Sequence, residues 1–362
     1  MATRYQKLRQ QAQARRTIRR MRPATIALDC MGTDIGPQEL LLGAFHAVEE
    51  YPSISVIATG PADKLHQIIR DNGWENPRLS VENATQVVGM DEGPRETLRK
   101  RDSSVTVAAR LVHEKRADGM VSAGNTGATM ATAMLQWRTL PGISRPAIVA
   151  VFPNPKRPCF LLDVGANVDC KPRHLLHFAI MGSAYARYVY HRRNPRVGIL
   201  SVGEEETKGN DLVFQTQDLL QASTLNFAGN AEGRDLMKGS FDVIVCDGFV
   251  GNTILKFGES LVSFIFQHIK EELSRSVVSQ LGAMAVMPAF KNLKKRVDYA
   301  EYGGAPLLGL HGNCVICHGS SRAKAIKNAI RVASEMVAAK VNDHIVELAK
   351  QNSTSSAAAS SL

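Results

Sequence analysis

Six times in this chain an apolar stretch is followed directly by a short polar loop rich in Gly, Asn, Ser or Asp. Such loops combine backbone N–H groups with amides and hydroxyls, and helical patterns follow most of them, so we expect an anion such as phosphate as the ligand. The six segments are TIALDCMGTD (25–34), GMVSAGNTG (119–127), CFLLDVGANVD (159–169), VGILSVGEEETKG (197–209), DVIVCDGFVGN (242–252) and CVICHGSS (314–321).

The second of these loops offers the best-defined set of phosphate-binding groups. Ser122, Gly124 and Gly127 surround Asn125 and Thr126 immediately before a helical pattern. Glycines allow the close backbone approach that a phosphate needs, while Asn125 and Thr126 add side-chain donors. A plain strand-to-helix turn with Asn125 or Thr126 as the helix cap is the alternative. We predict that Ser122, Gly124, Thr126 and Gly127 bind phosphate and that Asn125 takes part in catalysis.

Two further loops add candidate catalytic groups. Asp247 and Asn252 flank a strand–Gly–Asn–helix pattern like the one around Asn125, and Lys208 follows three consecutive acidic residues at 204–206. Lys208 would act as a point charge for an oxyanion, although solvated loop acids are the alternative for this segment. The predicted catalytic groups are therefore Asn125, Lys208, Asp247 and Asn252.

Other polar residues follow the remaining strands, and each could instead be a turn or cap residue. Their convergence at one edge of a sheet is what favours a site. We predict phosphate-binding roles for Asn167, Lys171, His318, Ser320 and Ser321, and a contribution from the first loop through Asp29, Gly32 and Asp34.

No cofactor or metal is expected. The dinucleotide-binding G-x-G-x-x-G does not follow the first strand, and G-x-x-x-x-G-K-[ST] is absent. The haem-attachment pattern C-x-x-C-H occurs at 314–318, but it lies in an apolar strand where Cys314 and Cys317 would face opposite ways. We therefore reject a haem site there.

Charge and composition exclude several classes of function. The chain has 362 residues and a net charge of +10, but residues 1–20 hold seven basic residues and no acidic one, which leaves +3 for the rest. No basic patch is interleaved with aromatic residues, so no nucleic acid is expected as a partner. No apolar run reaches the roughly 20 residues that span a bilayer, and the six cysteines are expected to be reduced thiols in the cytoplasm.

Strand and helix patterns alternate along most of the chain. The segments 147–152 and 159–162 read as an antiparallel hairpin, because the connection through 154–156 is too short for a crossover. We predict a doubly wound, three-layer α/β/α fold, whose mostly parallel sheet has an antiparallel hairpin insertion and whose core carries a protruding helical arm. One long helix is expected over 320–349.

The expected domain organisation is simple. Residues 1–22 form a basic, disordered extension, 23–350 form a single α/β catalytic domain, and 351–362 form a disordered tail. The helical arm covers about 252–300, and in its segment 281–296 an apolar, Met-rich run (281–290) is followed by Lys291, Lys294, Lys295 and Arg296. This segment suits an interfacial membrane contact, a partner groove or a homodimer interface, and these remain open.

Nine motifs in order carry a resemblance to a known family: LDCMGTDIGP, SAGNTGA, LDVGANVDCKP, IMGSAYA, GEEETKGN, NAEGRD, CDGFVGN, EYGGAPLLG and HGSSRAKAIKNAI. They resemble the bacterial phosphate acyltransferase family over about residues 21–340. The resemblance implies reversible transfer of a long-chain fatty acyl group from acyl carrier protein to inorganic phosphate, giving acyl phosphate for phospholipid synthesis. It also implies a cytoplasmic, peripherally membrane-associated enzyme that hands its product to a membrane glycerol-3-phosphate acyltransferase.

The first motif departs from the family pattern. The family usually reads Met-Gly-Gly-Asp-His there, whereas this chain has Thr33 and Ile35, so any role of that histidine is unavailable. We expect phosphate to attack the thioester directly in a ternary complex, because none of the cysteines has a clear activating neighbour except Cys317 beside His318.

Alternatives in other classes remain. One is a phosphate acetyltransferase-like enzyme that uses acyl-coenzyme A, and another is a relative of decarboxylating dehydrogenases with a nicotinamide cofactor. A basic-tailed protein that binds membranes or nucleic acid without catalysis is the third. The missing glycine fingerprint speaks against the dehydrogenase.

Overall fold

The computed structural model describes residues 23–154, 156–297 and 301–359. The chain divides into two compact units, Met1–Leu140 with Tyr302–His344 and Pro141–Glu301 with Ile345–Leu362. The range 23–350, for which the sequence predicts one domain, thus contains two units, each with its own strands and helices. The basic extension predicted at 1–22 lies outside the described residues.

Unit 1 is built on a mostly parallel sheet. Its described strands lie in the order β3-β2-β1-β4-β11-β10, and all neighbours are parallel except β10 and β11. The side chains of the central strands β1 and β4 are almost continuously buried, as expected for strands covered on both faces, whereas the edge strand β3 is mostly accessible. The strands are β1 (Ala24–Asp29), β2 (Ile54–Gly60), β3 (Leu79–Asn83), β4 (Gly119–Ser122), β10 (Ala305–Leu308) and β11 (Asn313–Ile316).

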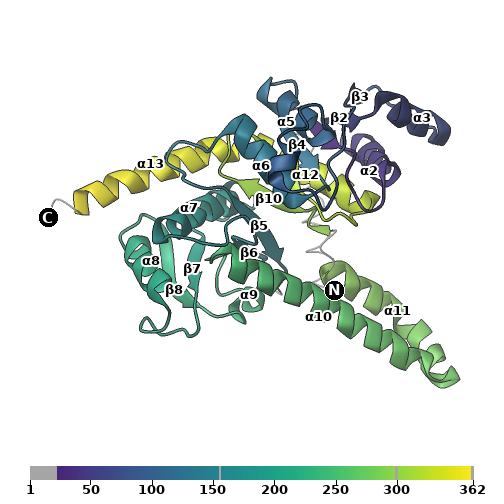
Figure 1. Ribbon diagram of the computed structural model, residues 1–362. Coiled ribbons are helices and arrows are strands. Elements are labelled where there is room, and N and C mark those ends of the chain that lie inside the picture. The colour runs from purple at the N-terminus through teal and green to yellow at the C-terminus, as the bar shows by residue number, and fades with distance from the viewer. Residues whose placement is uncertain (1–22, 155, 298–300, 360–362) are drawn as a thin grey trace. The chain divides into compact units, whose positions relative to one another are not determined.

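Helices cover both faces of this sheet. Helices α2 and α12 pack against each other, α5 and α6 form a second pair, and both α5 and α12 contact β1 (Figure 1). The helices of the unit are α2 (Pro37–Glu50), α3 (Ala62–Asn72), α4 (Pro94–Thr97), α5 (Ser104–His113), α6 (Thr126–Trp137) and α12 (Ala323–Ala338).

Unit 2 repeats the design with strands of its own. Its described strands lie in the order β5-β6-β9-β7-β8, and only β5 runs antiparallel to its neighbour β6. This pair confirms the predicted hairpin. The strands are β5 (Ala147–Phe152), β6 (Cys159–Leu162), β7 (Arg196–Leu200), β8 (Asn226–Ala231) and β9 (Val243–Val245), and the helices are α7 (Pro172–Tyr188), α8 (Asp211–Gln221), α9 (Asp235–Lys238), α10 (Gly248–Ser274) and α11 (Val277–Val297).

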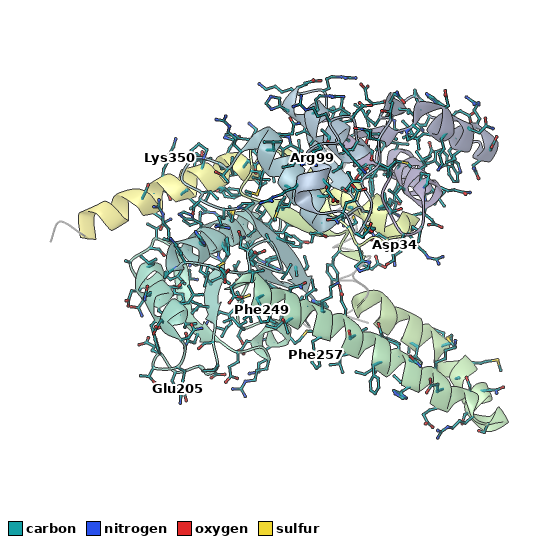
Figure 2. The ribbon with its side chains drawn as sticks, viewed as in Figure 1. Asp34, Arg99, Glu205, Phe249, Phe257 and Lys350 are labelled. Carbon is teal, nitrogen blue, oxygen red and sulfur yellow. The ribbon has the colours of Figure 1, made fainter. Side chains whose placement is uncertain are left out.

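The predicted helical arm is present. Within unit 2, α10 and α11 run side by side away from the sheet (Figure 1). Phe249 and Phe257 project from α10 (Figure 2) with exposed fractions of 66% and 67%, and Phe264 is 59% exposed. Helix α10 is long and apolar enough to cross a bilayer by length and composition, and only 6% of its most apolar window is buried. The sequence-based expectation that no segment has this length and composition was wrong for α10.

The C-terminal region differs from the prediction. The helix expected over 320–349 is two helices, α12 and α13 (Val341–Ala359), separated where Lys340 adopts a positive φ of 48°. Neither Gly nor Pro marks this break, so the residue types around it do not predict it. Helix α13 continues into the predicted tail 351–362, and Asn352 accepts a hydrogen bond from the backbone N–H of Thr224 at 2.8 Å. Residues 360–362 lie outside the described residues.

Candidate functional site

Three strands of unit 1 bring predicted site loops to one edge of the sheet. Strand β4 lies between β1 and β11, all three are parallel, and Ser122 is in register with both Asp29 and Ile316. The loops that follow these strands therefore begin side by side at their carboxyl ends, the edge where open α/β sheets bind ligands. The predicted convergence of the first loop, the loop at 122–127 and the loop at 318–321 is confirmed within this unit.

Asp29 and Ser122 form the buried base of this edge. Asp29 is 2% exposed and accepts a hydrogen bond from Ser122 Oγ at 2.8 Å, and Ser122 Oγ lies 3.1 Å from Thr129 Oγ1. Burial raises the pKa of Asp29, while hydrogen bonds with Ser104 and Ser122 oppose the shift. The backbone N–H of Gly124 also donates to Ser122 Oγ. Both groups are buried, and their hydrogen bonds hold the loop in place.

Asn125 is fully occupied by hydrogen bonds within the protein. Its Oδ1 accepts from the N–H of Ala128 at 2.9 Å and caps α6, while its Nδ2 donates to the carbonyls of Met90 at 2.7 Å and Glu92 at 3.1 Å. The side chain therefore joins the helix start to the segment 90–92. This is the capping role that the sequence left open as the alternative to phosphate binding.

The backbone at the start of α6 supplies the open donors. Thr126 is exposed and Gly127 is half-buried, and their N–H groups are the first two of the helix, which have no acceptor within it. No other described residue accepts a hydrogen bond from them. With the positive end of the helix dipole behind them, these two donors have the geometry and electrostatics that suit an anion.

The first loop and the loop at 318–321 contact each other. The N–H of Asp34 donates to the carbonyl of Gly319 at 3.1 Å, and His318 Nδ1 lies 2.8 Å from Ser320 Oγ. Asp34, His318 and Ser320 are exposed, whereas Ser321 is 1% exposed and turns inward. Of the predicted ligand-binding residues in this loop, His318 and Ser320 are accessible.

The first loop is fixed by its backbone. Gly32 has a φ of 71°, and a Cβ there would collide with the carbonyl of Val88, so only glycine fits. Thr33, which departs from the family pattern, accepts a hydrogen bond from the N–H of Gly36 at 3.0 Å and closes the next turn. The departure therefore has a structural role of its own.

Unit 2 presents a second edge of the same kind. Strands β6, β9, β7 and β8 are mutually parallel, so the residues that follow them share one edge. Asp163, fully buried after β6, accepts hydrogen bonds from the N–H groups of Ile148, Ala166 and Asn167 and from Asn167 Nδ2. Burial raises its pKa and the four hydrogen bonds oppose that shift. Asn167 also donates to the carbonyl of Pro146, so this pair shapes the loop.

The other predicted residues of unit 2 fall into two groups. Asp247 caps α10 by accepting from the N–H of Val250 at 2.9 Å. Lys171, Lys208 and Asn252 are exposed, and their side chains make no hydrogen bond or ion pair with the described residues. Lys208 is held in place by its backbone, whose carbonyl accepts from Ser201 Oγ and Asn230 Nδ2.

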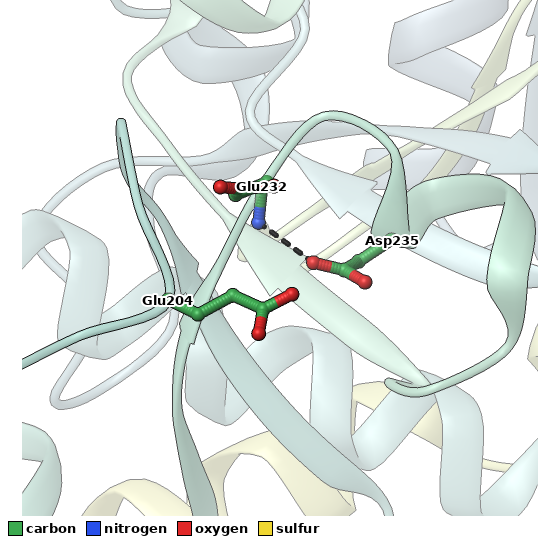
Figure 3. A group of neighbouring side chains, drawn as sticks. All are labelled: Glu204, Glu232 and Asp235. Atoms are coloured by element: carbon green, nitrogen blue, oxygen red, sulfur yellow. Dashed lines mark hydrogen bonds between the residues drawn. The ribbon is translucent and has the colours of Figure 1, made fainter.

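Three carboxylates in unit 2 lie close together, with ligand atoms within 4.8 Å of one another. They belong to Glu204, Glu232 and Asp235 (Figure 3). Arg234 pairs with both Glu204 and Glu232, and Lys238 lies 3.2 Å from Asp235. Because Arg234 and Lys238 already pair with all three carboxylates, these ion pairs account for the cluster without a metal ion.

The cysteines are poor nucleophiles. All six are free thiols, and only Cys170 is not buried. Burial raises the pKa of Cys317 to about 12, and it also raises the pKa values of Cys30 and Cys246, with Asp29 and Asp247 adding to these shifts. A thiol with a raised pKa is protonated near neutral pH and does not attack a thioester.

Sequence reasoning missed the segment 89–92. It is not among the predicted site segments, yet the carbonyls of Met90 and Glu92 accept hydrogen bonds from the amide of Asn125, and Lys100 donates to the Glu92 carboxylate at 2.6 Å. No residue type in this segment marks it as a support for the loop. The pairing depends on tertiary geometry.

Parallel strands that end in anion-binding loops, with a helix start open to a ligand, are typical of α/β enzymes that handle phosphate. The family model described as "Fatty acid synthesis protein" matches residues 24–344. A phosphate acyltransferase from Heliobacterium modesticaldum is 50% identical over 326 residues, covering 88% of this chain and 97% of the relative. One from Aquifex aeolicus is 49% identical over 322 residues, covering 89% and 95%. The chain belongs to the phosphate acyltransferase family, and the prediction from the sequence that it is an acyltransferase is confirmed.

Solved structures show the same fold at low sequence identity. A phosphotransacetylase from Streptococcus pyogenes aligns with a TM-score of 0.58 at 17% identity, covering 88% of this chain and 94% of the other. A phosphotransacetylase from Staphylococcus aureus aligns with a TM-score of 0.54 at 14% identity, covering 88% and 94%. These similarities confirm the predicted α/β fold.

Proposed function

We propose that this protein transfers a long-chain fatty acyl group from the thioester of acyl carrier protein to inorganic phosphate, forming acyl phosphate for phospholipid synthesis. The observation that carries the proposal is the open start of α6, where the N–H groups of Thr126 and Gly127 lack acceptors at the ligand-binding edge of unit 1. Family membership supplies the type of reaction.

This reaction depends more on the correct positioning of the substrates than on a strong general base. Phosphate is itself an anionic nucleophile, so the site must orient one oxygen toward the thioester carbonyl and stabilise the oxyanion that develops. Lys208 is the exposed cation proposed for that charge, and Asn252, His318 and Ser320 are the accessible polar side chains. The raised pKa values of the cysteines favour direct attack over an acyl-enzyme.

The reaction is tested by phosphate-dependent loss of the thioester from palmitoyl carrier protein, with acyl phosphate detected by mass spectrometry. Product that needs both enzyme and phosphate supports the proposal. No product from a folded enzyme with intact substrates contradicts it. An acyl adduct on the protein without phosphate would contradict direct attack.

Thr126→Pro tests the anion position itself. Proline fits the first helical residue, and Asn125 before it has φ −58° and ψ 120°, which a following proline tolerates. The variant removes one open N–H together with the hydroxyl, whereas the control Thr126→Ala removes the hydroxyl alone. We expect the KM for phosphate to rise roughly tenfold in Thr126→Pro beyond its value in Thr126→Ala, as for a lost hydrogen bond to a charged group. Equal values would contradict a role for this N–H.

A phosphate acetyltransferase-like reaction with acyl-coenzyme A is the alternative donor chemistry. The similarity in fold to a phosphotransacetylase is the observation that supports this alternative. Comparing kcat/KM for palmitoyl carrier protein, palmitoyl-coenzyme A and acetyl-coenzyme A decides between the two, and a preference for acetyl-coenzyme A would overturn the fatty acyl assignment.

We also propose that the protein is a cytoplasmic homodimer whose arm residues 281–296 touch the membrane, where a glycerol-3-phosphate acyltransferase takes up the acyl phosphate. Exposed apolar side chains on the arm support this, among them Met284 at 65% and Met287 at 42%. Co-flotation with anionic vesicles should be lost in Met284→Glu/Met287→Glu and kept in Ser279→Glu. Sedimentation measures the dimer, and a monomer at all concentrations would contradict it.

A further inference from the structure

One cavity in unit 1 lies outside the loops described above. It has a volume of about 380 Å³, within the range of small-molecule sites. Helices α5 and α6 and the segment after α4 form its walls, and it is lined by Leu98, Arg101, Thr106, Arg110, Thr132, Leu135 and Gln136.

Two guanidinium groups line this cavity without ion-pair partners among the described residues. Arg101 is exposed and Arg110 is half-buried, and neither forms a salt bridge there. The carboxylates whose pKa values Arg110 helps to lower, Glu82 and Asp102, are engaged elsewhere: Glu82 pairs with Arg116, and Asp102 accepts from Thr85. Both guanidiniums therefore keep their donors free for an anion. Arginine is well suited to phosphate because its planar fork binds two oxygens at once.

A buried hydroxyl in the same cavity lacks a partner. Thr132 is 2% exposed, yet its Oγ1 has no hydrogen-bond partner within the described residues. Unpaired buried polar atoms are rare in folded proteins and are commonly satisfied by a ligand or water. A donor–acceptor group on the ligand, such as an amide, would satisfy this hydroxyl.

The cavity also has apolar lining from two leucines, and it shares helix α6 with the anion position. Leu98 and Leu135 are 40% and 64% exposed. Helix α6 begins beside the open donors at Thr126 and carries Leu135 nine residues later, about 14 Å along the helix. A ligand that has an anionic group on the two arginines and also reaches the start of α6 must therefore span at least about 14 Å.

We propose that this cavity binds the phosphopantetheine arm of the acyl donor, with its phosphate on Arg101 and Arg110 and an amide on Thr132. The inference rests on the proposed acyl transfer and names how the donor is held. A carrier protein and coenzyme A both present this arm, so the shared chemistry is a phosphate-linked pantetheine, and the experiment separates the two sources.

The test measures binding directly, using the full chain and fluorescence anisotropy. The probes are labelled holo-carrier protein, which has the arm, apo-carrier protein, which lacks it, and coenzyme A as competitor. The test variant is Arg101→Gln/Arg110→Gln. The matched control is Arg95→Gln/Arg99→Gln, which removes two exposed charges from the same segment but none from the cavity. Thr132→Val removes the buried hydroxyl at nearly constant shape.

We expect the Kd for holo-carrier protein to rise about tenfold or more in Arg101→Gln/Arg110→Gln, as for lost hydrogen bonds to charged groups. It should rise a fewfold in Thr132→Val and less than twofold in the control. Competition by coenzyme A would show that the arm alone suffices. Absence of competition, with holo-carrier binding still dependent on both arginines, would assign the site to the carrier-borne arm.

Three results would overturn the proposal: equal binding of apo- and holo-carrier protein, an equal loss in the control, or no loss in the test variant. A melting temperature within 2 °C of wild type is required of each variant before its Kd is compared, and Arg101→Lys/Arg110→Lys serves as a second variant that keeps charge but loses the fork. Binding that depends on the arginines without acyl phosphate formation would leave the cavity assigned and refute only the proposed reaction.

Discussion

Replacing Asn125 by alanine should destabilise unit 1, because the side chain makes three hydrogen bonds within the protein. Loss of a helix N-cap costs about 1 kcal/mol. A protein hydrogen bond contributes about 0.5–1.5 kcal/mol. The two bonds to the carbonyls of Met90 and Glu92 lie at the low end of that range because one of them is exposed, so together they contribute about 0.5–1 kcal/mol. The sum is about 2 kcal/mol, or roughly 4–8 °C in melting temperature for a domain of this size.

Asn125→Ser separates the two roles of the side chain. Serine keeps a cap oxygen for Ala128 but cannot reach the carbonyls of the segment 90–92, so it should lose about half as much stability as alanine. Thermal unfolding followed by circular dichroism, together with the KM for phosphate, measures both effects. A wild-type melting temperature in Asn125→Ala, with a KM for phosphate raised a hundredfold, would refute this reasoning and make the amide a direct ligand.

Three further outcomes follow from the contacts in unit 2. Lys208→Gln should leave stability within about 0.5 kcal/mol and lower kcat/KM about a hundredfold, as for a lost oxyanion-stabilising group, whereas Lys256→Gln should leave kcat/KM unchanged. Gly251→Ala should cost about 1–3 kcal/mol or prevent folding, since its Cβ collides with the carbonyl of Asp163. Gly258→Ala on the same helix has open space and should stabilise by up to about 1 kcal/mol. Burial lowers the pKa of His177 from 6.5 to about 4, so its stabilising effect is full above pH 6.5 and is lost as the pH falls through 4. Between pH 8 and pH 5 this amounts to about 2 kcal/mol in urea titrations, and His177→Gln should remove that difference.

Much of the fold could be predicted because apolar strands and helix periods alternate so regularly. The hairpin at β5 and β6 followed from a connection too short for a crossover. Strand β8 was missed because its sequence, Asn226 to Ala231, has Gly229 and two asparagines in place of an apolar run. Strand β10 was missed because it follows Gly303 and Gly304, both at positive φ, and contains a proline. These strands depend on pairing with neighbours more than on their own propensity.

The sequence predicts which loops form the candidate site, but it does not predict which of their residues cap helices and which are free to bind a ligand. Asn, Asp, Ser and Gly after a strand serve equally as caps and as ligand groups, because both uses need a short side chain that reaches backbone or phosphate. The structure assigns Asn125, Asp247 and Asn167 to the first use through their hydrogen bonds. Lys208 and His318 remain accessible for the second.

The open backbone donors at the start of α6 could not be predicted from residue types alone. Every residue except proline has a backbone N–H, so residue type does not show which of these groups is free to bind a ligand. An N–H group is free only where no carbonyl or side chain of the protein accepts from it. At Thr126 and Gly127 that depends on Asn125, whose Oδ1 takes the N–H of Ala128 and leaves the two before it free. The cap therefore shapes the anion position without contacting the anion. A substitution of such a residue lowers enzyme activity because it disturbs the loop, not because it removes a ligand contact. Any variant of this loop therefore needs both a stability measurement and a KM for phosphate.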